Sequence, residues 1–148
     1  MSPRHVDVST ETEIARPVAV VATYAADPDN APEWYANIRS VEWRTDPPLR
    51  VGSVVAFTAR FLGRTLAYEY EIVALEIGVR LVMRTAQGPF PMETTYTWIP
   101  AAEGTRMTLR NRGAPTGFSK LLAPLLAPAM RRANRKDLRR LQEILEAR

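Results

Sequence analysis

The sequence predicts an α+β fold in which an antiparallel sheet of about six to seven strands is followed by one long C-terminal helix. Hydrophobic and polar residues alternate over most of residues 38–112, the pattern of strands with one buried face. Short turns separate these strands, so neighbouring strands are expected to pair as hairpins. From residue 118 onward the hydrophobic period changes to that of a helix.

Before the sheet, the chain shows one further strand and two short helices. Residues 6–14 alternate and predict a strand with one buried face. Pro17 is placed to open a short helix over residues 18–26. A second short helix is predicted to begin at Asn30, where Asn30 and Glu33 have the spacing of a capping box.

The remaining elements follow from the same two periods. The predicted strands cover residues 38–45, 53–62, 65–75, 79–86, 92–99 and 105–112. The last helix covers residues 118–147, with Leu138, Leu141 and Leu145 on its apolar side. Pro124 and Pro128 are expected to kink or interrupt its early turns, so its straight part should start near Pro128.

Length and composition restrict the classes of function. The 148 residues fit one domain over residues 1–148, and 46% hydrophobic with 24% charged residues is ordinary for a soluble protein. The chain has no cysteine, and its one histidine is His5, so disulfides, thiolate catalysis and multi-histidine metal sites are excluded. We expect no metal and no cofactor. Neither a secretory signal nor a membrane span is visible, which predicts a cytoplasmic protein.

The order of elements resembles the helix-grip fold of the START-related superfamily (SRPBCC), and in particular its polyketide cyclase/dehydrase branch. The resemblance covers nearly the whole chain. It is carried by Asp27-Pro28, Trp34, Val51-Gly52, Gly63-Arg64, Gly104-Thr105 and the closing Asp137-Leu-Arg-Arg-Leu141. The segment Glu76-Ile-Gly78 departs from the family pattern, in which a proline is common at this turn.

This resemblance implies a curved sheet wrapped around the long helix, with an apolar cavity between them. Relatives bind lipids, sterols, polyketides or plant hormones, and a minority catalyse cyclisation or dehydration. No common catalytic set runs through the branch, so no catalytic residue is carried over. Alternation and helical spacing then place the expected ligand-binding residues: Trp34, Phe57, Phe61, Tyr68, Tyr70, Met83, Tyr96, Trp98, Asn111, Met130, Asn134 and Asp137.

Each of these side chains also has a purely structural interpretation. The aromatic and methionine residues can simply fill the core, and Trp34 either closes one end of the cavity or packs there. The tyrosine hydroxyls can be satisfied within the protein. Asp137 can pair with Arg140 or with an arginine of the sheet, and Asn134 can bond to a loop carbonyl.

Three functions remain open. The favoured one is a binding protein or carrier for a small hydrophobic or aromatic molecule. The second is a polyketide cyclase, aromatase or dehydratase that uses the tyrosines, Asn134 and Asp137 to position substrate and move protons. The third uses the basic side of the last helix, because residues 117–148 hold 8 basic and 3 acidic residues. That side suits an anionic membrane surface better than nucleic acid, since no aromatic residues are interleaved for base stacking. A homodimer is left open.

Overall fold

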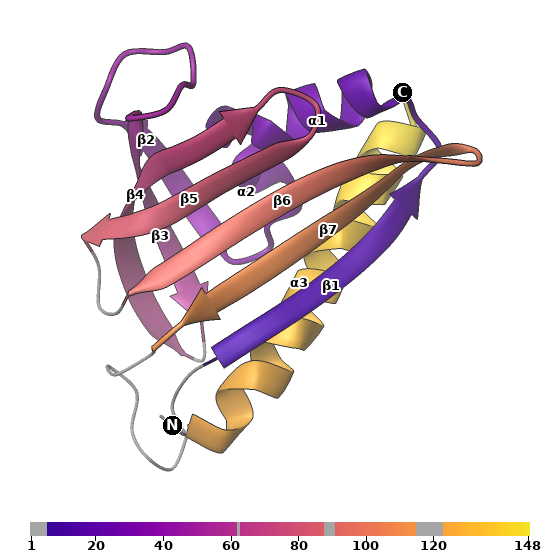
Figure 1. Ribbon diagram of the computed structural model, residues 1–148. Coiled ribbons are helices and arrows are strands. Elements are labelled where there is room, and N and C mark those ends of the chain that lie inside the picture. Colours follow the sequence, from indigo (N-terminus) through magenta and orange to yellow (C-terminus); the bar gives the residue numbers. More distant parts are fainter. Residues whose placement is uncertain (1–5, 62, 88–90, 115–122) are drawn as a thin grey trace.

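The computed structural model describes residues 6–61, 63–87, 91–114 and 123–148, and it is a seven-stranded antiparallel sheet with its helices on one face (Figure 1). Along the chain the elements are β1 (Val6–Ile14), α1 (Val18–Ala26), the 3-10 turn η1 (Pro28–Asn30), α2 (Ala31–Trp34), β2 (Ile38–Trp43), β3 (Val54–Phe61), β4 (Arg64–Glu76), β5 (Arg80–Gln87), β6 (Met92–Ala101), β7 (Gly104–Gly113) and α3 (Ala123–Glu146). This architecture confirms the α+β helix-grip fold.

The sheet order is β1-β7-β6-β5-β4-β3-β2, so the six strands from β2 to β7 form the meander that the short turns predict. β1 completes the sheet by pairing with β7 in a continuous antiparallel register from Val6 opposite Gly113 to Ile14 opposite Thr105. Alternation predicts that β1 is a strand but does not say which strand it pairs with. Because β1 pairs with β7, its last residue lies opposite the start of β7, and α1 begins a few residues later.

Bulges bend the sheet around the helix. An extra residue lies in β2 between Ile38 and Ser40, in β4 between Ile72 and Ala74, and in β5 between Thr85 and Gln87. A bulge adds an unpaired residue to one strand and bends it. The 13-residue β4 therefore curves, and the concave face of the sheet holds α3.

The first turns of the helices differ from the sequence predictions. Asn30 makes no capping bond; its side chain donates to the carbonyl of Tyr24 at 3.1 Å. Glu33 accepts a hydrogen bond from the Tyr24 hydroxyl, so the predicted capping box is wrong. Instead Asp27 caps the 3-10 turn, accepting from the backbone N–H of Asp29 at 3.0 Å. Both side chains of the expected capping box bond to Tyr24 of α1 instead.

Pro128 does not interrupt α3, which runs from Ala123 to Glu146 with this proline inside it. The N–H groups of a helix's first four residues have no intrahelical partner, so Pro124 loses nothing. Pro128 removes one bond, to residue 124 in the opening turn, a small loss compared with 24 helical residues. The five residues before Ala123 that were predicted to be helical lie outside the described part of the chain.

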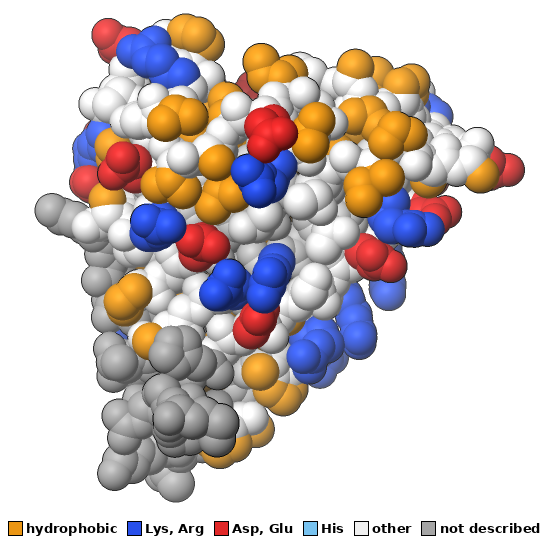
Figure 2. Space-filling model, viewed as in Figure 1, with side chains coloured by type: hydrophobic (Ala, Val, Ile, Leu, Met, Phe, Trp, Pro, Cys, Tyr) orange, Lys and Arg blue, Asp and Glu red, His pale blue; other side chains and the backbone are white. Residues whose placement is uncertain are grey.

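Side chains of opposite charge are interspersed on the outer face of the sheet (Figure 2). Arg110 binds both carboxylate oxygens of Asp7, at 2.9 and 2.7 Å, across β7 and β1. Arg84 lies 3.1 Å from Glu93 on the neighbouring strand. Alternation correctly places these arginines outside, so the inner face is left for apolar and uncharged polar side chains.

Candidate functional site

A cavity of about 170 Å³ lies between the inner face of the sheet and α3. Strands β3 to β7, the segment from α1 to β2 and one side of α3 supply its walls. Most of the lining is apolar. Its larger apolar and aromatic members are Leu49, Phe57, Leu66, Tyr68, Tyr70, Ile72, Leu81, Met83, Met92, Tyr96, Leu126 and Met130.

Aromatic rings form the wall along β3 and β4. Phe57 meets Tyr70 edge to face, with ring centroids 5.9 Å apart, and Tyr68 lies 5.8 Å from Tyr70 along the same strand. Such contacts stabilise the rings against one another in addition to their burial. The wall is therefore ordered before any ligand enters.

Asp137 is the buried carboxylate of the site. It lies in α3, is only 3% exposed, and accepts a hydrogen bond from the backbone N–H of Ala36 at 3.0 Å. Burial raises the pKa of its carboxyl from 3.8 to about 6, against the opposing effects of the Ala36 bond and of Lys136. It forms no ion pair with the described residues, and Arg140 instead donates to the carbonyl of Glu33. The ion-pair alternative for Asp137 is thus wrong.

Asn134 lies one helical turn before Asp137 and also lines the cavity. Its residue is 5% exposed, and its Nδ2 atom has no hydrogen-bond partner among the residues that the structure describes. The expected bond to a loop carbonyl is therefore absent there. A buried amide N–H without a partner costs free energy, so the group calls for an explanation.

A pair of tyrosine hydroxyls completes this end of the site. Tyr35, which follows α2, and Tyr96 of β6 have their hydroxyl oxygens 2.5 Å apart. Burial raises the pKa of both hydroxyls, and the nearby Asp137 carboxylate contributes to both increases. One proton is shared within the pair, and the second is left for another acceptor.

A second polar group lies on β6 and β7. The Thr94 hydroxyl donates to Asn111 Oδ1 at 2.8 Å, and both residues line the cavity. Burial raises the pKa of Tyr70, while interactions of its hydroxyl with Thr94 and Thr85 oppose the increase. This group is largely satisfied within the protein, unlike Asn134.

Nine of the twelve sequence-predicted residues line the cavity, and the structure does not bring two of the others there. Trp34 is fully buried and packs against the rings of Tyr35 and Tyr96, with ring centroids 4.1 and 5.7 Å away. Trp98 faces a separate groove beneath α1, because it lies toward the other end of β6. The side chain of Phe61 lies outside the described part. The nine lining residues are Phe57, Tyr68, Tyr70, Met83, Tyr96, Asn111, Met130, Asn134 and Asp137.

Sequence reasoning missed Tyr35 and Thr94. Thr94 shares the inward side of β6 with Tyr96, so alternation could have found it. Tyr35 follows the four-residue helix α2, which is too short for a periodic pattern. Only contact with Tyr96 reveals its role.

The described residues hold no group of three His, Cys, Asp or Glu side chains suited to a metal ion. Within the same residues, no helix is both long and apolar enough to span a membrane.

Solved structures of other proteins share the fold described above. A protein of Thermus thermophilus has the same fold with a TM-score of 0.81 and 23% identity, covering 95% of this chain and 97% of that one. The Zhui aromatase/cyclase of a Streptomyces species gives 0.79 and 16%, covering 98% and 94%. A START superfamily protein of Mycobacterium smegmatis gives 0.79 and 12%, covering 95% and 97%. The comparison with curated proteins gave no match.

These likenesses show the fold alone, but a family model reaches further. The model described as polyketide cyclase / dehydrase and lipid transport matches residues 5–146. The chain therefore belongs to the polyketide cyclase/dehydrase and lipid transport family.

Proposed function

We propose that the protein binds a small hydrophobic or aromatic molecule in the cavity between the sheet and α3. The observation that carries this proposal is an apolar hollow of about 170 Å³ that holds one buried amide without a partner among the described residues. A few polar groups in a mostly apolar wall are typical of a small-molecule site. Burying about 150 Å² of apolar ligand surface would contribute roughly 4 kcal/mol before the cost of association.

A pair of alanines tests this proposal. Ala59 of β3 lines the cavity, whereas Ala67 on the neighbouring strand is exposed. A thermal-shift screen with fatty acids, sterols and phenols should find ligands that stabilise the native protein. Ala59→Phe should abolish that shift because its ring enters the cavity, and Ala67→Phe should retain it. If no compound of any class shifts the melting temperature or binds in calorimetry, the proposal fails.

One observation favours a second candidate, a cyclase or dehydratase. Asp137 is buried with a pKa near 6 and no cation partner among the described residues, which suits a general acid or base at neutral pH. The Tyr35–Tyr96 hydroxyl pair lies close enough to Asp137 for the carboxylate to raise the pKa of both hydroxyls. Together these groups can hold a carbonyl and move a proton.

A ring-sized β-hydroxy ketone tests this candidate. In the dehydration of 3-hydroxycyclohexanone, a base takes a proton from the carbon beside the carbonyl, and the protonated base then gives that proton to the hydroxyl, which leaves as water. The product, cyclohexenone, is followed by its absorbance. The wild-type rate should rise with ionisation of a group of pKa near 6, and Asp137→Asn should bring the rate to that of buffer alone. Equal rates for both proteins would exclude Asp137 as the base.

A further inference from the structure

The charged groups that line the cavity all have one sign. Asp27 and Asp137 are acidic, and no basic side chain is found in the described lining. Asp27 lies at the rim, since it also lines the two neighbouring surface hollows. One of its carboxylate oxygens accepts a hydrogen bond from the Asp29 N–H. Asp137 is thus the charged group inside. A ligand that carries a carboxylate or phosphate would find repulsion there and no counter-charge.

Asn134 and Asp137 both line the cavity, and their side chains carry complementary hydrogen-bonding atoms. They occupy successive turns of α3, so their Cβ atoms are roughly 5–6 Å apart on one side of the helix. Asn134 offers an N–H donor with no partner among the described residues, and Asp137 offers carboxylate oxygens whose one recorded partner is the Ala36 N–H. A single hydroxyl satisfies both, because it donates once and accepts as well.

The size of the cavity limits the rest of the ligand. A cavity of about 150 Å³ holds one benzene molecule. The 170 Å³ found here therefore matches one substituted ring, and a sterol or a fused polyketide is larger than this volume.

We propose that the cavity selects a neutral, ring-sized molecule with a hydroxyl group, of the phenol or cyclic alcohol class, whose hydroxyl donates to Asp137 and accepts from Asn134. This inference rests on the proposed function, since it specifies what the same cavity binds. The second proton of the Tyr35–Tyr96 pair is a further donor for a carbonyl on such a ring.

Four probes of nearly equal size separate the contributions to affinity of the donated hydrogen bond, the accepted hydrogen bond and the ligand's charge. The probes are p-cresol, 4-methylanisole, p-xylene and p-toluate, and binding is measured by calorimetry and by NMR shifts at pH 8. The p-cresol hydroxyl makes both bonds, 4-methylanisole can only accept, p-xylene does neither, and p-toluate is anionic. We expect p-cresol to bind at least about tenfold more tightly than 4-methylanisole and p-xylene. No binding of p-toluate is expected.

Two variants assign the selectivity. Asp137→Asn keeps an acceptor for the Ala36 N–H but removes the charge, so it should reduce the preference for p-cresol and admit p-toluate. Asn134→Leu removes only the bond that the hydroxyl accepts, so it should reduce the preference for p-cresol over p-xylene severalfold without abolishing it. Glu143→Gln, on the exposed side of α3, is the control and should leave all four affinities unchanged.

The outcomes separate this inference from the function on which it rests. If p-toluate, laurate or p-xylene binds as tightly as p-cresol, the inference is overturned while a ligand-binding cavity remains. If the preference for p-cresol is unchanged in both variants, the assignment to Asn134 and Asp137 is overturned. If no probe, fatty acid or sterol binds, the proposed function fails and the inference fails with it.

Discussion

Asp137 shows how one residue can connect stability with function. A carboxylate taken from water into an apolar wall costs free energy unless a charge or several hydrogen bonds compensate. Here the Ala36 N–H and the adjacent Lys136 compensate only in part, and the pKa of the carboxyl remains raised at about 6. The hydroxyls of Tyr35 and Tyr96 also lie near this carboxyl. A group that costs stability in the free protein is one that a ligand can relieve.

The pH dependence of stability tests this cost. Because the folded-state pKa of Asp137 lies above its unfolded value of 3.8, the native state binds more protons between these values. Its contribution to stability is therefore present below about pH 4 and lost as pH rises through 6. Asp137→Asn should be more stable than wild type by up to about 3 kcal/mol at pH 8 and nearly equal at pH 4. Urea unfolding at both pH values measures the difference; a constant difference would contradict the raised pKa.

Asn134 and Asn111 differ in whether their side chains have a hydrogen-bond partner, and this difference predicts opposite effects of their removal on stability. The Asn111 side chain accepts from Thr94, whereas Asn134 Nδ2 is without a partner among the described residues. Asn134→Leu should therefore raise the free energy of unfolding by about 1 kcal/mol or more, and Asn111→Leu should lower it by about 1–3 kcal/mol because Thr94 loses its acceptor. Chemical denaturation of both variants decides the matter. Equal destabilisation would mean that Asn134 already has a structural partner.

Among the elements, strands were more predictable than helix ends. Alternation of period two places Phe57, Tyr68 and Met83 on the inner face, because a strand allows only two directions for a side chain. A helix end has many competing partners: the Asn30 side chain bonds to the Tyr24 carbonyl instead of capping α2. Local sequence lists the candidate bonds, but the neighbouring elements decide which of them form.

The residues of the cavity follow the same rule as the elements: those on strands and on α3 were predictable, and those on short connections were not. Residues on regular elements, such as Asn134 and Asp137 in α3, were found from helical spacing. Tyr35 was not, because its position depends on the short connection between α2 and β2 and on a partner 61 residues away. The bulges of β2, β4 and β5 likewise have no sequence signal, although they bend the sheet that forms one wall of the cavity.

Gly104 ties β7 to the end of β1. A Cβ atom there would overlap the Ile14 carbonyl oxygen and would approach the backbone nitrogen of Arg16 to 2.7 Å. Gly104→Ala should therefore cost more than about 2 kcal/mol, because backbone has to move. Gly52→Ala is the comparison: its φ of +94° is strained for alanine but its surroundings are open, which predicts about 1 kcal/mol. Thermal unfolding of both variants gives the order, and a milder effect at Gly104 would contradict the close packing of β1.

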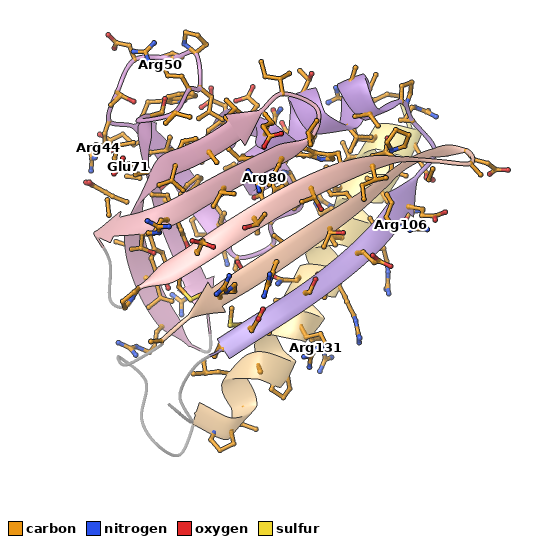
Figure 3. The ribbon with its side chains drawn as sticks, viewed as in Figure 1. Arg44, Arg50, Glu71, Arg80, Arg106 and Arg131 are labelled. Carbon is orange, nitrogen blue, oxygen red and sulfur yellow. The ribbon has the colours of Figure 1, made fainter. Side chains whose placement is uncertain are left out.

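At the scale of the whole molecule, the described cations of the sheet and those of α3 lie in different environments. On the sheet they alternate with carboxylates, as at Arg80 with Glu76 and Arg106 with Glu13, whereas Arg131 projects from α3 (Figure 3). None of the cations of the basic side of α3 forms an ion pair within the described residues. They are Arg131, Arg132, Arg135, Lys136, Arg139 and Arg140. Contact of this side with an anionic membrane stays a prediction.

Repulsion along this side predicts a gain from charge reversal. Arg135 is four residues from both Arg131 and Arg139, and like charges at this spacing destabilise a helix by a few tenths of a kcal/mol per pair. Arg135→Glu replaces two repulsions with two attractions and should raise the melting temperature at low salt. The gain should shrink in 1 M NaCl, where the Debye length is about 3 Å. Arg110→Glu, which breaks the pair with Asp7, should have the opposite sign. A loss of stability in Arg135→Glu would show that Arg135 has a stabilising partner in the folded protein.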